Sequence, residues 1–428
     1  MKNSFFLFTI IITVILSCSK NNSEVSVPTV PSGNPVVSSP VTLIGFTPTS
    51  GPAGTLITIN GTNFSSNASS NIVRINDVVI PVLTATSTQL TITIPSGVGT
   101  GRISITLAGI QVFSTSVFSK VATTSTLAGQ IYTFGFLNGP GASAKFKNPM
   151  GVAIDLSGNI FVADADNHCI RKIITDGTVS TFAGNGTAGS ANGQGTAASF
   201  WSPYGLAFDS QGNLFVSEYY GNRIRKISPQ GNVSTFAGSG VSGYVNGVGI
   251  AAQFYAPAGI TIDGNDNIYV ADNANNRIRK ITSNGVVTNF AGNGGSSNSG
   301  GTMIYPRDVK VAVMGNLYVV GNPFSAPILK VTPSGQISDY TPLAIGYLDG
   351  DLSIAQFQDP RSLCFDNAGN LYVADNLGGR LRKISVNGQV STIDISSISS
   401  PSLGMAIDAN GNFIMSKSTG HCIIKITP

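Results

Sequence analysis

The sequence has few charged residues and few histidines, and each shortage narrows what the protein can do. Charged residues make up 10% of the 428 residues, against roughly 25% in an average soluble domain. The chain has only two histidines, His168 and His421, whereas a catalytic zinc site needs about three protein ligands, often histidine. A Ser-His-Asp set, a phosphate-binding loop and a Cys-x-x-Cys motif are also missing. Common catalytic and nucleotide sites therefore have no support in the sequence.

The excess of basic residues is small, with a net charge of +4. Of the 24 Lys and Arg residues, 13 fall at one strand position of a repeated unit. They are therefore spread around the repeat, whereas nucleic-acid binding uses a contiguous basic face. We expect a structural or solvated role for them and no nucleic-acid partner.

Cysteine is also scarce, with four residues in the chain. Cys18 belongs to the leader described below, which leaves an odd number of thiols. Cys169 and Cys422 hold equivalent positions in different repeats, too far apart for a bridge, and Cys364 lies in an apolar strand. We expect no disulfide.

The first residues have the pattern of an export signal. Lys2 precedes an apolar run at residues 5–16, which is too short to span a bilayer. The sequence ILSC at residues 15–18 resembles the bacterial lipoprotein signal, which implies a signal peptide at residues 1–17 and lipidation of Cys18. The alternative is a plain secretory signal. Residues 18–41 are rich in Ser, Pro and Asn, a composition that predicts a flexible tether.

Glycine is abundant, 50 of 428 residues, and no stretch has sustained helical periodicity. With many Val, Ile, Thr, Ser and Asn residues, this predicts an all-β protein with many turns. Residues 42–120 contain short alternating strands separated by Gly, Pro and Asn turns, as in a small antiparallel β-sandwich. The run from Pro48 to Phe64, PTSGPAGTLITINGTNF, resembles the immunoglobulin-like IPT/TIG family. Such domains usually serve as spacers or interaction modules.

Residues 121–428 contain a repeated unit that begins at a proline and has four short strands, a to d. The six leading prolines are Pro149, Pro203, Pro257, Pro306, Pro360 and Pro401. The motif P-x-G-x-x-x-D-x-x-G-N-[IL]-[FY]-V-x-[DE] resembles the NHL repeat, which implies a β-propeller. The fourth unit departs most, with Asp308, Ala312 and Gly321 at motif positions.

The last unit ends after strand c, while residues 125–129 read as a strand d with no unit before it. Pairing the two would remove two open sheet edges. The sequence therefore predicts a six-bladed NHL-type propeller, closed by an N-terminal strand that pairs with the last blade.

Positions that differ between the units are the candidates for ligand contact. The loops before strand a and those between strands b and c share one face of a propeller, where binding sites are common. Aromatic side chains gather there in units two and three, and arginines follow two leading prolines. The candidate site residues are Trp201, Tyr204, Tyr219, Tyr220, Tyr255, Arg307 and Arg361.

Recurring positions are expected to be structural. The two histidines stand where other units have asparagine or glycine, in the turn before strand c. One aspartate series recurs at the a–b turn, which it caps, and a second acidic series recurs at the end of strand b. The loop phenylalanines Phe146, Phe200, Phe254 and Phe357 are expected to pack within their loops.

Together these features predict a non-catalytic, membrane-anchored binding or scaffold protein whose propeller face recognises a polysaccharide or an envelope or surface protein. The leader and tether resemble those of Bacteroidetes-type lipoproteins, which implies an outer-membrane lipoprotein on the cell surface or the periplasmic face. The alternative is a lactonase-like hydrolase or lyase with a metal ion in the channel. No cofactor is expected; calcium would accompany only that alternative.

Overall fold

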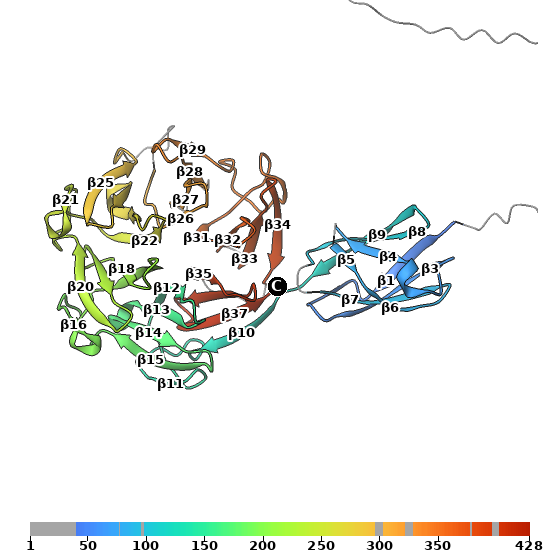
Figure 1. The fold of residues 1–428 in the computed structure, drawn as a ribbon, viewed down its shortest axis with the longest axis horizontal. Coiled ribbons are helices and arrows are strands. Elements are labelled where there is room, and N and C mark those ends of the chain that lie inside the picture. Colours follow the sequence, from blue (N-terminus) through green and yellow to red (C-terminus); the bar gives the residue numbers. More distant parts are fainter. Residues whose placement is uncertain are drawn as a thin grey trace, which may run out of the picture. The chain divides into compact units, whose positions relative to one another are not determined.

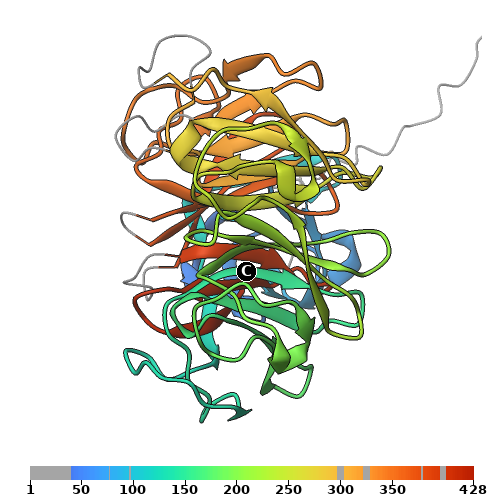
Figure 2. The ribbon, with the colours of Figure 1, turned by 90° about the vertical axis from the view of Figure 1, so that its left-hand side faces the viewer.

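A computed structural model of the chain describes residues 40–76, 78–95, 98–295, 303–321, 328–376, 379–395 and 402–428. The expected signal peptide, Cys18 and nearly all of the tether lie outside these residues. The described part consists of strands, turns and a few short 3₁₀ segments (Figures 1 and 2). None of its helices is long and apolar enough to cross a membrane. The all-β prediction is confirmed.

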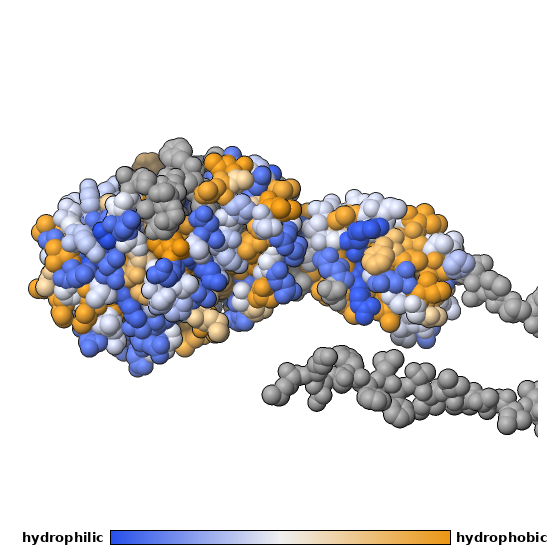
Figure 3. Space-filling model, turned by 90° about the horizontal axis from the view of Figure 1, so that it is seen from above, coloured by the Kyte–Doolittle hydropathy of each residue, from blue (hydrophilic) through white to orange (hydrophobic). Residues whose placement is uncertain are grey.

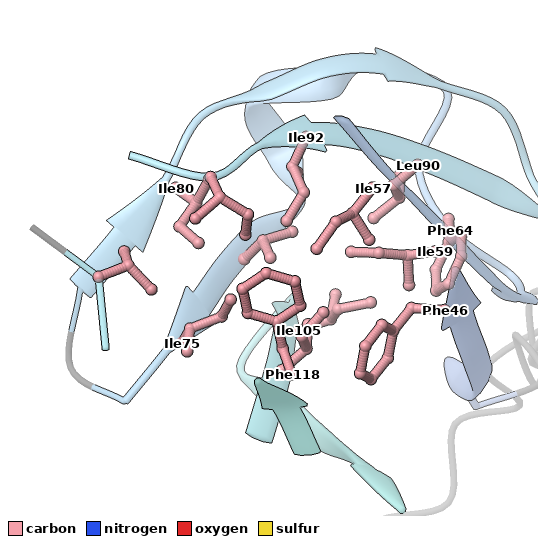
Figure 4. Close-up of a cluster of buried hydrophobic side chains, with 14 of the residues drawn as sticks. Phe46, Ile57, Ile59, Phe64, Ile75, Ile80, Leu90, Ile92, Ile105 and Phe118 are labelled. Atoms are coloured by element: carbon pink, nitrogen blue, oxygen red, sulfur yellow. The ribbon is translucent and has the colours of Figure 1, made fainter. Parts of the chain in front are cut away.

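Two sheets form the sandwich of residues 41–120. One has the order β1 (Thr42–Thr47), β3 (Leu56–Thr62), β7 (Gln89–Thr93) and β6 (Val82–Ala85). The other has the order β2 (Ser50–Gly51), β9 (Ile110–Lys120), β8 (Gly101–Leu107), β4 (Ile72–Ile75) and β5 (Val78–Ile80). A short 3₁₀ turn, η1 (Ala68–Ser70), precedes β4. Alternate residues such as Ile57, Ile59, Leu90 and Ile92 point into a core that also contains Phe118 (Figure 4), as period-2 patterning requires.

The described residues from Thr123 onward form six antiparallel sheets (Figure 1). The first four in chain order contain β11 (Gly139–Pro140), β12 (Pro149–Ile154), β13 (Ile160–Asp164), β14 (Cys169–Ile173) and β15 (Thr178–Ala183); β16 (Gly193–Gln194), β17 (Pro203–Phe208), β18 (Leu214–Glu218), β19 (Arg223–Ile227) and β20 (Asn232–Ala237); β21 (Gly247–Val248), β22 (Pro257–Ile262), β23 (Ile268–Asp272), β24 (Arg277–Ile281) and β25 (Val286–Ala291); and β26 (Asp308–Val311), β27 (Leu317–Val320), β28 (Leu329–Val331) and β29 (Ile337–Asp339). Each sheet corresponds to one repeated unit.

The last two sheets follow the same plan. They contain β30 (Gly350–Asp351), β31 (Pro360–Phe365), β32 (Leu371–Asp375), β33 (Arg380–Ile384) and β34 (Gln389–Asp394); and β10 (Thr123–Ala128), β35 (Ser402–Ile407), β36 (Phe413–Lys417) and β37 (Cys422–Thr427). In the latter, β10 pairs antiparallel with β37, from Thr123 opposite Thr427 to Ala128 opposite Ile423. The 3₁₀ turns η2 (Ala165–Asn167), η3 (Gly195–Ala197), η4 (Gly249–Ala251) and η5 (Asn273–Asn275) lie in the connections.

The strand a of each unit contacts the strand a of the next, in the order β12, β17, β22, β26, β31 and β35, and β35 contacts β12. The glycine of the P-x-G motif makes this approach possible. A Cβ atom on Gly151 would overlap the carbonyl oxygen of Tyr204, and one on Gly404 would overlap that of Met150. The motif glycine is therefore a packing requirement of the inner strands.

The long loops are fastened by buried arginines in strand c. Arg171 is fully buried and pairs with Asp164 at 2.8 Å between Nη1 and Oδ2. Its Nη2 donates to the carbonyl oxygen of Leu137 and to Oδ1 of Asn138 in the preceding loop, and its guanidinium lies 5.0 Å from the ring centre of Phe146. The same arrangement recurs at Arg225, Arg279 and Arg382. The structural roles expected for these arginines, for the strand-b acids and for the loop phenylalanines are confirmed.

The aspartates of the a–b turns are caps, as expected. Asp155 Oδ1 accepts hydrogen bonds from the backbone N–H groups of Ser157 and Asn159 at 2.9 and 2.8 Å. The three cysteines that the structure describes, Cys169, Cys364 and Cys422, are free and buried.

Candidate ligand-binding site

The candidate site lies where the strands a begin, at the mouth of the space that they surround. A narrow cavity of about 20 Å³ is lined there by Tyr204, Arg307, Asp308, Lys310 and Ser362, among others. That volume suits roughly one water molecule. Farther along the same strands, a cavity of about 280 Å³ is lined mainly by apolar side chains such as Phe208 and Phe365. A ligand at the mouth therefore meets polar and aromatic groups.

Three tyrosines form a continuous aromatic group at this mouth. The rings of Tyr204 and Tyr219 are stacked, with centroids 5.5 Å apart and an interplanar angle of 27°. Tyr219 meets Tyr220 edge to face at 5.2 Å. Tyr220 is 61% exposed, whereas Tyr204 and Tyr219 are half-buried. The group thus begins at the cavity and ends in solvent.

Burial raises the pKa of two tyrosine hydroxyls in this group above the ordinary value of 10. It raises the pKa of Tyr204 to about 12, against the opposing effect of Arg307. Burial also raises the pKa of Tyr219, helped by Tyr220 and Tyr255. Neutral phenols with polar tips can both stack on a ligand and exchange hydrogen bonds with it.

Trp201 and Tyr255 lie beside this group without stacking on it. Their rings are 47% and 49% exposed, and their backbone N–H groups donate to the strand-b carboxylates of Glu218 and Asp272 at 2.9 and 2.8 Å. In the described part of the chain, neither ring has a close aromatic partner. Of the candidate aromatics, the structure thus brings Tyr204, Tyr219 and Tyr220 of unit two into ring contact.

The two arginines of the site come from units four and five. Arg361 Nε lies 2.8 Å from Asp359 Oδ2. Arg307 lines the cavity, and its pKa is lowered by burial and then by Arg361. Asp308 stands where the motif has glycine. Its carboxylate pairs with Lys310 at 3.0 Å and accepts hydrogen bonds from the next unit, including the Leu363 N–H at 2.9 Å.

Tyr305 is a surface residue that the sequence comparison missed. It precedes Pro306, as Ser202 and Ala256 precede their prolines, and it is 52% exposed. The fourth unit has Met303 in place of the loop phenylalanine. An alignment that starts from this phenylalanine in each unit therefore passes over Tyr305. Counting back from each leading proline would have found it.

The two histidines join neighbouring units. His168 Nδ1 accepts a hydrogen bond from the Ser202 N–H at 3.2 Å, and His421 Nδ1 accepts one from the Asn148 N–H at 3.1 Å. Asn222 and Asn276 accept equivalent bonds through Oδ1 at 2.9 and 2.8 Å. The structural role expected for the histidines is confirmed. The described residues also contain no group of three or more His, Cys, Asp or Glu side chains that could hold a metal ion.

The outer surface is mixed in character. On the side that Figure 3 shows, hydrophobic residues are interspersed with hydrophilic ones. An exposed apolar residue alone is therefore a weak indication of a binding site here. The tyrosine group differs from these scattered residues because its rings contact one another, and Arg307 differs because it lines the cavity.

Comparison with known proteins agrees with both parts of the chain. Residues 40–121 match the IPT/TIG domain, and residues 146–173 and 254–281 match the NHL repeat. Protein SUPPRESSOR OF QUENCHING 1, chloroplastic, of Arabidopsis thaliana is 28% identical over 297 residues, which are 62% of this chain and 28% of that protein. The chain therefore spans less than a third of this relative.

Solved structures share the fold at low identity. A Bacteroides thetaiotaomicron protein of unknown function has a TM-score of 0.57 at 20% identity, covering 91% of this chain and 98% of its own. An auxiliary nutrient binding protein of the same species has a TM-score of 0.55 at 15% identity, and the match covers 90% of this chain and 97% of that one. A gluconolactonase of Xanthomonas campestris has a TM-score of 0.51 at 14% identity, and the match covers 72% of this chain and 89% of that one. The chain is thus an all-β protein with an IPT/TIG domain and NHL repeats, and its structural neighbours are Bacteroides propeller proteins.

Proposed function

We propose that this chain is a non-catalytic binding protein whose propeller face recognises a polysaccharide. The observation on which this rests is the stacked group of Tyr204, Tyr219 and Tyr220 beside Arg307 at the cavity mouth. The apolar faces of sugar rings pack on aromatic planes, and their hydroxyls bond to polar tips and charged groups. Equivalent positions in other units lack this combination, so blade architecture does not require it.

The architecture that presents this face is a six-bladed propeller closed by β10. Two observations support it. The strands a contact one another in a cycle, and β10 supplies the fourth strand of the sheet that contains β35, β36 and β37. A closed ring leaves no free sheet edge at the junction of the first and last units.

The proposed setting is the outer membrane, on the cell surface or the periplasmic face, with lipidated Cys18 as the anchor. It is supported by the export pattern of residues 1–17 and the tether composition of residues 18–41. The nutrient-binding description of one Bacteroides neighbour is compatible with glycan capture. Mass spectrometry of the membrane fraction for an acylated N-terminal Cys18 would test the anchor.

A glycan array tests the proposed function directly. The wild-type protein should bind a restricted set of polysaccharides. Replacing Trp201 or Tyr220 with Ala should weaken that binding at least about threefold without much change in melting temperature. Phe113→Ala is the control, because Phe113 lies in β9 of the sandwich, away from the propeller units, and is 51% exposed. Metal-dependent turnover in a lactone and esterase panel, with no glycan bound, would instead establish the hydrolase or lyase alternative.

A further inference from the structure

The cavity mouth carries more positive than negative charge. Three basic side chains, Arg307, Lys310 and Arg361, face two acidic ones, Asp308 and Asp359. Lys310 pairs with Asp308 at 3.0 Å, and Arg361 pairs with Asp359 at 2.8 Å. Arg307 has no carboxylate of its own in the described part of the chain, so one positive charge is left over.

The difference from the buried arginines of strand c lies in the terminal nitrogens, because Nε of Arg171, Arg225, Arg279 and Arg382 is also buried without a hydrogen-bond partner among the described residues. In Arg171, both terminal nitrogens are bonded, Nη1 to Asp164 and a carbonyl oxygen, and Nη2 to Leu137 and Asn138. In Arg307, by comparison, Nη1 is buried and has no hydrogen-bond partner among the described residues. A buried charged donor without a partner is costly, and a ligand acceptor would remove that cost.

Two side-chain oxygens in the loop that precedes β31 lack a hydrogen-bond donor, whereas Arg307 lacks an acceptor. Asp359 Oδ1 and Gln358 Oε1 are both buried without a donor from the described residues. They come from the loop that precedes β31, and the charge of Asp359 acts on Arg307. Arg307 thus lacks one acceptor, and the loop that precedes β31 lacks two donors, among the described residues.

We infer that this mouth binds an acidic sugar, with its carboxylate or sulfate on Arg307, its hydroxyls donating to Asp359 and Gln358, and its ring against the tyrosine group. The inference rests on the proposed function and specifies its ligand class. An oxyanion suits the planar guanidinium fork, and sugar hydroxyls supply donors beside the anionic group. Tyr204 connects the charged part of the site with the tyrosine group, because it lines the same cavity as Arg307 and stacks on Tyr219.

The test is a glycan array with matched neutral, carboxylated and sulfated members, followed by calorimetry with trigalacturonic acid and neutral galactotriose. We expect anionic glycans to bind about tenfold or more tightly than their neutral counterparts. The array distinguishes carboxylate from sulfate, because one anionic series should dominate. Arg307→Gln should remove the preference for anionic over neutral glycans, whereas Tyr220→Ala should weaken both classes and keep that preference.

Arg74→Gln, in strand β4 of the sandwich, is the matched control, because it removes the same charge from a different domain. It should keep the preference for anionic glycans within about twofold, since the effect of net charge on long-range attraction is small beside a direct ion pair. Arg307→Lys guards against a folding defect, because it keeps the charge and should give intermediate binding. Equal binding of neutral and anionic glycans by the wild type would overturn the inference and leave the proposed function standing. Binding of no glycan would overturn both.

Discussion

Acid should loosen the contacts between neighbouring blades through His168 and His421. Each imidazole accepts a backbone hydrogen bond through Nδ1, from Ser202 and Asn148 respectively. Burial lowers the pKa of both histidines from 6.5, with Lys147 acting in the same direction and Asp166 against it. A protonated Nδ1 cannot accept these bonds.

The direction of the pH effect on stability follows from the difference in histidine pKa between the folded and unfolded states. Because the folded-state pKa is lowered, the unfolded chain takes up protons first as the pH falls. The stability from these contacts is therefore complete above the unfolded pKa of about 6.5 and is lost as the pH falls below it. At about 0.5–1.5 kcal/mol for each hydrogen bond, the two contacts should contribute about 1–3 kcal/mol.

The repeat supplies the control substitution, since Asn222 and Asn276 make the same bond without titrating. Urea unfolding of the wild type and of the His168→Asn, His421→Asn double variant should be compared at pH 7.5 and pH 5. The variant should match the wild type at pH 7.5 and exceed it by about 1–3 kcal/mol at pH 5. A stability difference that does not change with pH would refute the reasoning, as would marked destabilisation of the variant at pH 7.5.

Three other perturbations test the fold. Deleting residues 123–129 removes five paired positions of β10 and should cost about 2–7 kcal/mol, seen as a lower propeller melting temperature; deleting residues 42–120 should leave that temperature nearly unchanged. Asp164→Ala leaves Arg171 buried without its carboxylate and should cost about 3–5 kcal/mol in urea unfolding, whereas Asp176→Ala in an exposed turn should leave the unfolding transition nearly unchanged. Burial raises the pKa values of Cys169, Cys364 and Cys422, so site-resolved alkylation at pH 8 should reach them only after unfolding; fast labelling of the native protein would contradict their placement.

Most of the fold could be predicted from the sequence, because its signals are local and recur in register. The leading prolines, the Asp-capped turns and the alternation of apolar residues each specify a short piece of backbone. Equivalent positions also separated structural from variable residues, which explains why the histidine–asparagine series was interpreted correctly.

The site was less predictable, because its geometry depends on which side chains of different strands and different units meet. Tyr204 and Tyr219 could be named, but their stacking depends on strand b lying beside strand a within one sheet. Arg307 lacks a carboxylate partner among the described residues because Asp308 pairs with Lys310 and Asp359 pairs with Arg361. Which carboxylate pairs with which basic side chain cannot be read from a single sequence. Tyr305 was missed because its unit has lost the phenylalanine used for alignment.

One feature of the blade junctions also has a practical use in engineering. The residues before four leading prolines, Asn148, Ser202, Ala256 and Tyr305, all have positive φ values between 44° and 55° and contact the preceding blade through the main chain. Their side chains already range from a methyl group to a phenol. Combinatorial libraries at these positions could therefore give the same scaffold new ligand preferences while keeping the main-chain contacts between blades intact.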